Sequence, residues 1–186
     1  MELELTGARV VITGAASGIG AACAGISGPF GVDVADIALK DWQRVLAVNV
    51  TGQFLFVKHA LPALRRAAGA AVVLMASDSG FVAAPGMVPY NASKGAVVQL
   101  TRALSVDLFA DSVRVNCVCP SIVDTPMARV DLGVAEGGFA AMDYPVQTPA
   151  EVARHVLYLS SPASRPVNGT AMISDFGYLA RSSFPA

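Results

Sequence analysis

A tyrosine and a lysine four residues apart could transfer protons in this chain. If this segment is helical, Tyr90 and Lys94 share one face, so the ammonium can lie within several ångströms of the phenol. A free phenol, with a pKa of about 10, is a poor base at neutral pH, but a nearby cation favours the phenolate and lowers that pKa. The pair predicts a group that exchanges a proton with a substrate hydroxyl. Alone this spacing is a weak signal, because it also arises by chance.

A serine at the end of a predicted strand could hold the substrate oxygen. Residues 71–76 form a short apolar run typical of a buried strand, and Ser77 follows directly. Side chains at the carboxyl ends of parallel strands face the ligand crevice of an open α/β sheet. A hydroxyl that only caps a loop is the alternative. Asp78 could also contact substrate, although a loop carboxylate in solvent is the favoured interpretation.

A glycine-rich turn near the beginning of the chain predicts a phosphate-binding loop. The β-branched run 10–12 predicts a strand, which breaks into Gly14, Ser17, Gly18, Ile19 and Gly20. If a helix follows, its N–H groups and dipole can hold a pyrophosphate, and glycines there let the backbone approach the ligand. A turn without a ligand is the alternative. The coincidence of this turn with Ser77 and the Tyr90–Lys94 pair favours binding.

Strands and helices must alternate to position these groups. The predicted strands are 10–12, 71–76, 113–119 and 170–174, and the predicted helices are 41–66, 93–109 and one that Thr148 opens through a capping box with Glu151. This alternation predicts an α/β fold, a doubly wound parallel sheet covered on both faces, in a single domain 1–186. The stretch between Pro120 and Thr148, which is rich in glycine and proline, predicts a mobile surface segment.

The composition favours a small-molecule partner. Hydrophobic residues make up 54% of the 186 residues and charged residues 15%, and the net charge of −1 shows no basic stripe, so neither nucleic acid nor a membrane is expected. Three cysteines without metal-ligand spacing predict buried free thiols in a reducing cytoplasm. No signal peptide is recognised at the N-terminus. His59 and His155 lack a second ligand at metal spacing, so no metal site is expected.

Taken together, these motifs resemble those of the short-chain dehydrogenase/reductase family over most of the chain. The resemblance is carried by the following segments: Thr13–Gly20 for T-G-x-x-x-G-x-G, Cys23–Gly25 for the end of N-N-A-G, Val48–Gly52 for N-x-x-G, Ser77 thirteen residues before Tyr90, Tyr90–Lys94 for Y-x-A-S-K, and Arg114–Thr125 for R-V-N-x-V-x-P-G-x-V-x-T. The fold this implies is Rossmann-like.

The resemblance implies an oxidoreductase that interconverts a secondary alcohol and a ketone with NAD or NADP. It makes Tyr90 the general acid/base, Lys94 the group that lowers the pKa of Tyr90 and binds the nicotinamide ribose, Ser77 the substrate-orienting hydroxyl and Asn49 the holder of a relay water. The residues implied in cofactor binding are Gly14, Ser17, Gly18, Ile19, Gly20, Gly25, Tyr90, Lys94, Pro120, Val123 and Thr125. It also implies a homodimer or homotetramer, and a substrate lid at 127–147 with an apolar lining.

The match breaks after Gly20. Only two residues separate Gly20 from Cys23, where the family has roughly 60 more, carrying its strands 2 to 4 and the residue that selects NAD or NADP. An internal deletion in the gene, an omitted segment and a naturally short variant remain open. We expect either that residues 21–26 take the place of the fourth strand or that the first strand slides over. Ser121 and Asp175-Phe176-Gly177 are smaller departures, where the family prefers Gly and D-G-G.

The leading hypothesis is therefore an oxidoreductase of this type with a shortened dinucleotide-binding region. The alternative is a catalytically silent remnant that acts at most as an oligomerisation or interaction module.

Overall fold

The computed structural model describes residues 10–12, 25–135 and 138–181, and its centre is a parallel sheet. The sheet has four strands in the order β1-β2-β3-β4: β1 Val10–Ile12, β2 Ala71–Met75, β3 Arg114–Pro120 and β4 Ala171–Ser174. All neighbouring pairs are parallel. Within one or two residues at each end, these are the strands that the apolar runs predict.

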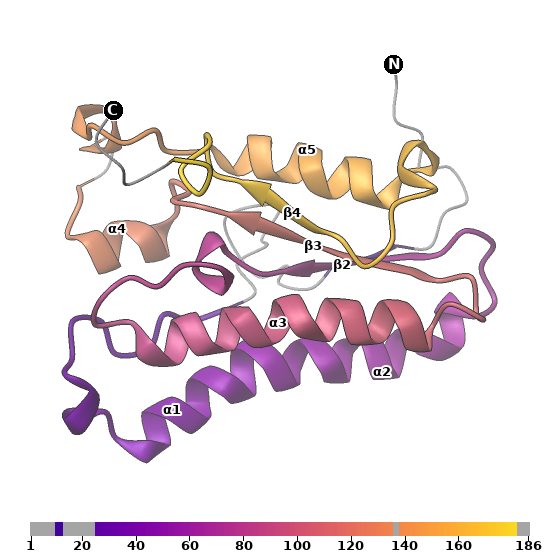
Figure 1. Ribbon diagram of the computed structural model, residues 1–186, viewed down its shortest axis with the longest axis horizontal. Helices are drawn as coiled ribbons and strands as arrows, with labels where there is room; N and C mark the ends of the chain where they lie inside the picture. Colours follow the sequence, from indigo (N-terminus) through magenta and orange to yellow (C-terminus); the bar gives the residue numbers. More distant parts are fainter. Residues whose placement is uncertain (1–9, 13–24, 136–137, 182–186) are drawn as a thin grey trace.

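Helices cover both faces of the sheet, as predicted (Figure 1). One face carries α1 Leu39–Leu46, α2 Gly52–Leu64 and α3 Val88–Asp107, and the other carries α5 Pro149–Ser160. A short helix, α4 Pro126–Leu132, follows β3 at the carboxyl end of the sheet. The arrangement is a Rossmann-like three-layer α/β fold.

Strand β2 is buried on both faces, which explains its unbroken apolar sequence. Val72 and Leu74 pack into the core beneath α2 and α3, whereas Val73 and Met75 pack into the core beneath α5. Successive side chains of a strand point to opposite faces, so a strand between two helical layers needs an apolar residue at every position.

Two helix boundaries differ from the predictions. Helix α3 begins at Val88, so the predicted start at Ser93 is wrong, and Tyr90 lies in the first turn with Pro89 beside it. Proline is tolerated there because the first helical N–H groups have no partner within the helix. The predicted helix 41–66 is a continuous helical run, but a π-helical turn, Ala47–Thr51, separates α1 from α2. Such turns have no simple periodic signature in a sequence.

The first strand takes the position next to β2. Val10, Val11 and Ile12 pair with Ala71, Val72 and Val73, and the described residues between β1 and β2 contain no strand. This agrees with the predicted loss of strands 2 to 4 and with the expectation that the first strand slides over. The other expectation, a strand over residues 21–26, falls mostly outside the described residues, and its described end, Gly25 and Ile26, is not in a strand.

A glutamine side chain from α2 hydrogen-bonds to the backbone at the end of β2. Ala76 N–H bonds to Val118 O on the β3 side, so the backbone groups of Met75 point to the opposite edge, toward β1. Gln53 Nε2 donates to Met75 O at 3.2 Å, and Met75 N–H donates to Gln53 Oε1 at 3.2 Å. The Gln53 amide thus satisfies backbone groups that a neighbouring strand would otherwise pair, as buried backbone groups require.

Candidate active site

A cavity of about 710 Å³ lies at the carboxyl ends of β2 and β3. Open α/β sheets bind ligands at this end of their strands. Most of its wall is apolar, from side chains that include Phe30, Met87, Ile122, Met127 and Leu132. The lining residues with polar side chains are Ser27, Ser77, Asp78, Ser79, Tyr90, Lys94, Ser121, Thr125, Asp131, Tyr144 and Tyr178.

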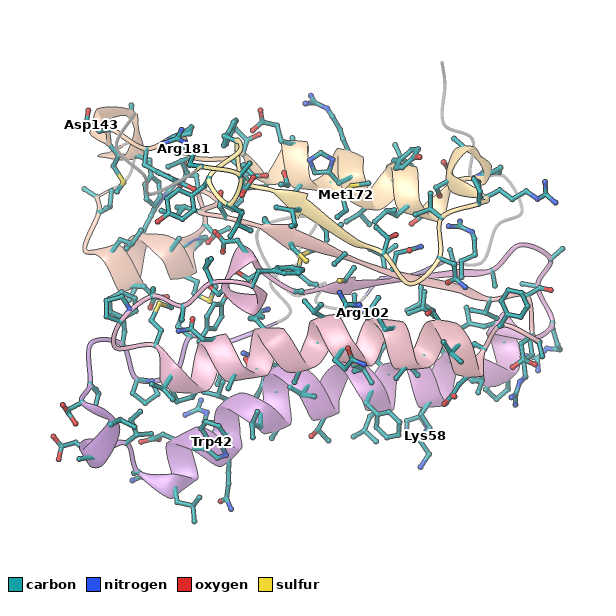
Figure 2. The ribbon with its side chains drawn as sticks, in the orientation of Figure 1. Trp42, Lys58, Arg102, Asp143, Met172 and Arg181 are labelled. Carbon is teal, nitrogen blue, oxygen red and sulfur yellow. The ribbon has the colours of Figure 1, made fainter. Side chains whose placement is uncertain are left out.

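Lys94 is buried although it carries a charge. Only 3% of the residue is exposed, and its Nζ donates to the carbonyl oxygen of Met75 at 3.2 Å. In contrast, the side chain of Lys58 extends from α2 into solvent (Figure 2). Burying an ammonium costs free energy unless hydrogen bonds or charges compensate it. The surroundings of Lys94 must therefore supply such compensation.

Tyr90 stands on the same face of α3 as Lys94, as the spacing predicts. The Nζ atom of Lys94 lies 5.4 Å from the centre of the Tyr90 ring, and both residues line the cavity. A cation at this distance interacts favourably with the ring. The structure therefore brings together the phenol and the ammonium that the sequence singles out.

Ser77 also reaches the cavity, but its hydroxyl already has partners. Its Oγ accepts the Ser79 N–H at 3.2 Å and lies 2.9 Å from Asp78 Oδ1 and 3.3 Å from Pro120 O as a donor. These contacts follow from the short 3-10 helix Asp78–Gly80, which Ser77 caps. Ser77 therefore caps the loop, as the alternative interpretation holds, and it also lines the cavity.

Asn49 links the segment at Ile26 to helix α3 through hydrogen bonds. It is fully buried in the π-helical turn, and its amide pairs with the backbone of Ile26: Ile26 N–H donates to Oδ1 at 2.8 Å, and Nδ2 donates to Ile26 O at 3.0 Å. Nδ2 also donates to Ser93 Oγ at 2.9 Å, and Ser93 Oγ donates to Tyr90 O at 2.7 Å. Asn49 is not among the residues that line the cavity, so holding a relay water stays a prediction.

Gly25 lies directly against the side chains of Asn49 and Lys94. A Cβ atom on Gly25 would lie 2.9 Å from Asn49 Oδ1 and 3.2 Å from Lys94 Nζ, so a side chain would force both groups to move. The residue also lines the cavity. Here the need for glycine comes from close approach rather than from backbone conformation.

The other predicted cofactor-binding residues divide into two groups. Pro120, Val123 and Thr125 line the cavity, and Thr125 Oγ1 also caps α4 by accepting the Ala128 N–H at 3.2 Å. The remaining group lies outside the described residues: Gly14, Ser17, Gly18, Ile19 and Gly20.

The predicted lid contributes part of the cavity wall. Met127, Leu132 and Tyr144 line it as expected, and Tyr144 makes an edge-to-face contact with Tyr178, with ring centres 5.3 Å apart. Val130, which was expected to join this lining, is 81% exposed. Helix α4 turns that side chain away from the cavity.

Asp78 corrects the sequence interpretation most clearly. It is half-buried on the cavity wall rather than a carboxylate in solvent. Burial raises its pKa, whereas hydrogen bonds from Ser77 and Ser79 lower it by a smaller amount and the charge of Asp175 raises it further. Its place directly after Ser77, at a strand end, was the signal available in the sequence.

The prediction of buried free thiols is confirmed for the two cysteines that the structure describes. Cys117 and Cys119 are buried free thiols with their sulfur atoms 3.7 Å apart, and Cys23 lies outside the described residues. His59 is exposed, and His155 Nε2 lies 2.9 Å from Ser174 Oγ. Across the described residues, no three His, Cys, Asp or Glu side chains gather as metal ligands would, and no helix could cross a membrane.

Comparison with known proteins shows the family to which this chain belongs. A family model described as Enoyl-(Acyl carrier protein) reductase matches residues 18–179. The chain is 36% identical over 178 residues to the short-chain dehydrogenase fogB of Aspergillus ruber, covering 83% of this chain and 64% of that protein. It is 34% identical over 151 residues to a cyclopentanol dehydrogenase of Comamonas testosteroni, covering 79% and 60%.

Solved structures agree. The aldohexose dehydrogenase of Thermoplasma acidophilum superposes with a TM-score of 0.78 at 26% identity, covering 88% of this chain and 68% of that one. The fold and the site define a Rossmann-like α/β protein with oxidoreductase relatives. The chain belongs to the short-chain dehydrogenase/reductase family. It spans less than two thirds of the length of the curated relatives named above, which agrees with its shortening.

The end of the lid is anchored by Gln147, a residue that the sequence did not single out. Gln147 is buried, its Oε1 accepts the Ser174 hydroxyl at 2.6 Å, and its Nε2 donates to Ser174 O at 2.6 Å and to Ser121 Oγ at 3.3 Å. It thus ties the lid to the ends of β3 and β4. No local pattern marks such a residue, because its partners lie 26 and 27 positions away.

Replacing Gln147 with alanine should destabilise the fold. The change Gln147→Ala removes three side-chain hydrogen bonds and leaves a cavity where the buried amide packs, so we expect the free energy of unfolding to fall by about 2–4 kcal/mol. Urea unfolding would measure the loss. The matched control is Gln99→Ala on the exposed face of α3, for which we expect less than about 0.5 kcal/mol. Equal losses for the two variants would show that the anchor contributes nothing special.

Proposed function

We propose that this chain is an NAD(P)(H)-dependent oxidoreductase that interconverts a secondary alcohol and a ketone. The observation that carries the proposal is the Tyr90 ring 5.4 Å from the buried Lys94 ammonium, on the wall of a largely apolar cavity that Ser77 shares. The named activities of the relatives, such as cyclopentanol dehydrogenase, agree with this type of reaction.

Tyr90 is the general acid/base in this proposal. During oxidation its phenolate accepts the proton of the substrate hydroxyl, and during reduction its phenol returns a proton to the new alkoxide. Lys94 favours the phenolate electrostatically, because its cation is held close to the ring by Met75 O. Ser77 donates its hydroxyl proton to the substrate oxygen and orients it.

The described residues fit the nicotinamide half of the cofactor. Gly25 leaves the backbone open beside Lys94 Nζ, and the hydroxyl of Thr125 and the backbone of Val123 lie on the same cavity wall. When bound, the nicotinamide supplies the hydride acceptor or donor. We propose that Lys94 also holds the ribose and that Pro120, Val123 and Thr125 hold the carboxamide end. The phosphate-binding role of Gly14, Ser17, Gly18, Ile19 and Gly20 stays a prediction, as does the choice between NAD and NADP.

Replacing Tyr90 with phenylalanine tests the proposal. Tyr90→Phe keeps the ring but removes the proton, so kcat for a secondary alcohol should fall by at least about 100-fold, while KM for the cofactor changes little. Steady-state kinetics would measure both.

The matched control is Tyr158→Phe, the same change on α5 away from the cavity. It should retain turnover. Unchanged turnover in Tyr90→Phe would sink the assignment, and no turnover in the unmodified chain would favour the silent-remnant alternative.

We also propose that the chain forms a homodimer or homotetramer in the cytoplasm. Support comes from α2, where the side chains of Phe54, Leu55 and Phe56 are each at least 40% exposed. Large apolar side chains left exposed together favour an interaction surface. Light scattering coupled to gel filtration should give two or four times the chain mass of 19.1 kDa. A monomer mass would contradict the proposal.

A further inference from the structure

The hydroxyl of Ser77 has one proton, and Asp78 competes with a substrate oxygen for it. A serine hydroxyl donates one hydrogen bond, and its two possible acceptors here are Asp78 Oδ1 at 2.9 Å and Pro120 O at 3.3 Å. The carboxylate is nearer and charged, so it is the stronger acceptor. In this arrangement the proton that a substrate carbonyl would need points toward Asp78.

No cation among the described residues forms an ion pair with Asp78. The ion pairs within the described part of the chain are Arg65–Asp111 and Arg129–Asp124, and Asp78 takes part in neither. The serine hydroxyls of Ser77 and Ser79 both approach the same oxygen, Oδ1. A carboxylate offers about four acceptor positions, so Asp78 can accept further donors from a ligand in the cavity.

The charges on the cavity wall restrict the kinds of ligand that can bind there. Asp78 and Asp131 both line it, and Lys94 is the one cation among the described residues of its wall. Ser27 Oγ already donates to Asp131 Oδ2. An anionic ligand would meet two carboxylates with one ammonium, and the rest of the wall is largely apolar. A neutral ligand that carries a hydrogen-bond donor fits this surface best.

We propose that Asp78 binds a second hydroxyl next to the reacting carbon, so that the preferred substrates are vicinal diols and α-hydroxy ketones with an apolar body. This inference rests on the proposed function. Ser77 and Asp78 are adjacent, and their oxygens lie one hydrogen-bond length apart, as do the two oxygens of a vicinal diol. The second hydroxyl donates to Asp78, and the Ser77 proton is released to the reacting oxygen.

The redox balance is that of the proposed reaction. Oxidation breaks the carbinol C–H bond and the O–H bond, the hydride passes to NAD(P)+ and the proton to Tyr90. The second hydroxyl keeps its proton and stays bound to Asp78. Burial raises the pKa of Asp78, because an ionised carboxylate on this wall is partly removed from water. A hydrogen-bond donor on the ligand would therefore stabilise the ionised carboxylate.

A binding experiment tests this without turnover. Ligand-observed NMR titrations would give dissociation constants of cis-cyclohexane-1,2-diol and cyclohexanol for the full chain. We expect the diol to bind about tenfold tighter, because hydrogen bonds to a charged group are stronger than those between neutral groups. The preference should fall to about unity in Asp78→Ala and be partly kept in the isosteric Asp78→Asn, whose oxygen still accepts.

The control variant is Asp107→Ala, which removes an exposed carboxylate from the last residue of α3 and should keep the full preference. Circular dichroism would confirm that the variants fold. Equal affinities of the two ligands in the unmodified chain, or a preference that survives in Asp78→Ala, would overturn the inference.

Kinetics separate this inference from the proposed function. For Asp78→Ala, kcat/KM should fall for 2-hydroxycyclohexanone and rise for cyclohexanone, because the Ser77 proton is then free for a simple ketone. A parallel change for both substrates would contradict the role of Asp78. If the unmodified chain reduces neither ketone, the proposed function fails, while the NMR titrations still decide what Asp78 binds.

Discussion

The burial of one ammonium group constrains the whole site. Met75 O accepts a hydrogen bond from Lys94 Nζ at 3.2 Å and the Tyr90 ring lies 5.4 Å away, and both contacts stabilise the ammonium at the inner end of the cavity. That carbonyl is available only because β2 ends at Met75 with its backbone groups directed away from β3. The chain at Gly25 lies so close to the ammonium that a side chain there would collide with it. Asn49 holds this segment in place through two hydrogen bonds to the backbone of Ile26. Strand, helix and connecting segment are therefore positioned around one charge.

The same contacts explain how the site tolerates a shortened sheet. Among the described residues β1 pairs with β2 as far as Val73, and the backbone groups of Met75 on the same edge need partners. Gln53 and Lys94 satisfy them from the helical layer. The groups proposed to transfer protons all lie on elements after Gly25, and the contacts described for them above join residues of that same part of the chain. The shortening thus falls on the region proposed to hold the dinucleotide, and the Tyr90–Lys94–Ser77 arrangement is retained.

Local patterns predicted the parts of the site that depend on local geometry. The spacing of Tyr90 and Lys94 indicated a shared helical face, and the apolar run before Ser77 indicated a strand end; both follow from the periods of helix and strand. The capping box at Thr148 and Glu151 is present as predicted. The π-helical turn at Asn49, the inward direction of Asp78 and the anchor at Gln147 depend on contacts between distant segments, which no periodicity encodes. Phe176 adopts a left-handed φ of 54°, a conformation that glycine takes without strain and phenylalanine does not, so the departure noted in the sequence puts a strained residue in this turn.

Isotope transfer tests most directly the claim that this chain keeps its proton- and hydride-transfer chemistry. The chain would be incubated at high concentration with cyclohexanol deuterated at the carbinol carbon and with NAD+ or NADP+, and the reduced cofactor analysed by mass spectrometry. The account predicts deuterium in the nicotinamide with the unmodified chain and none above background with Tyr90→Phe. Absence of deuterium with the unmodified chain at saturating cofactor would contradict it.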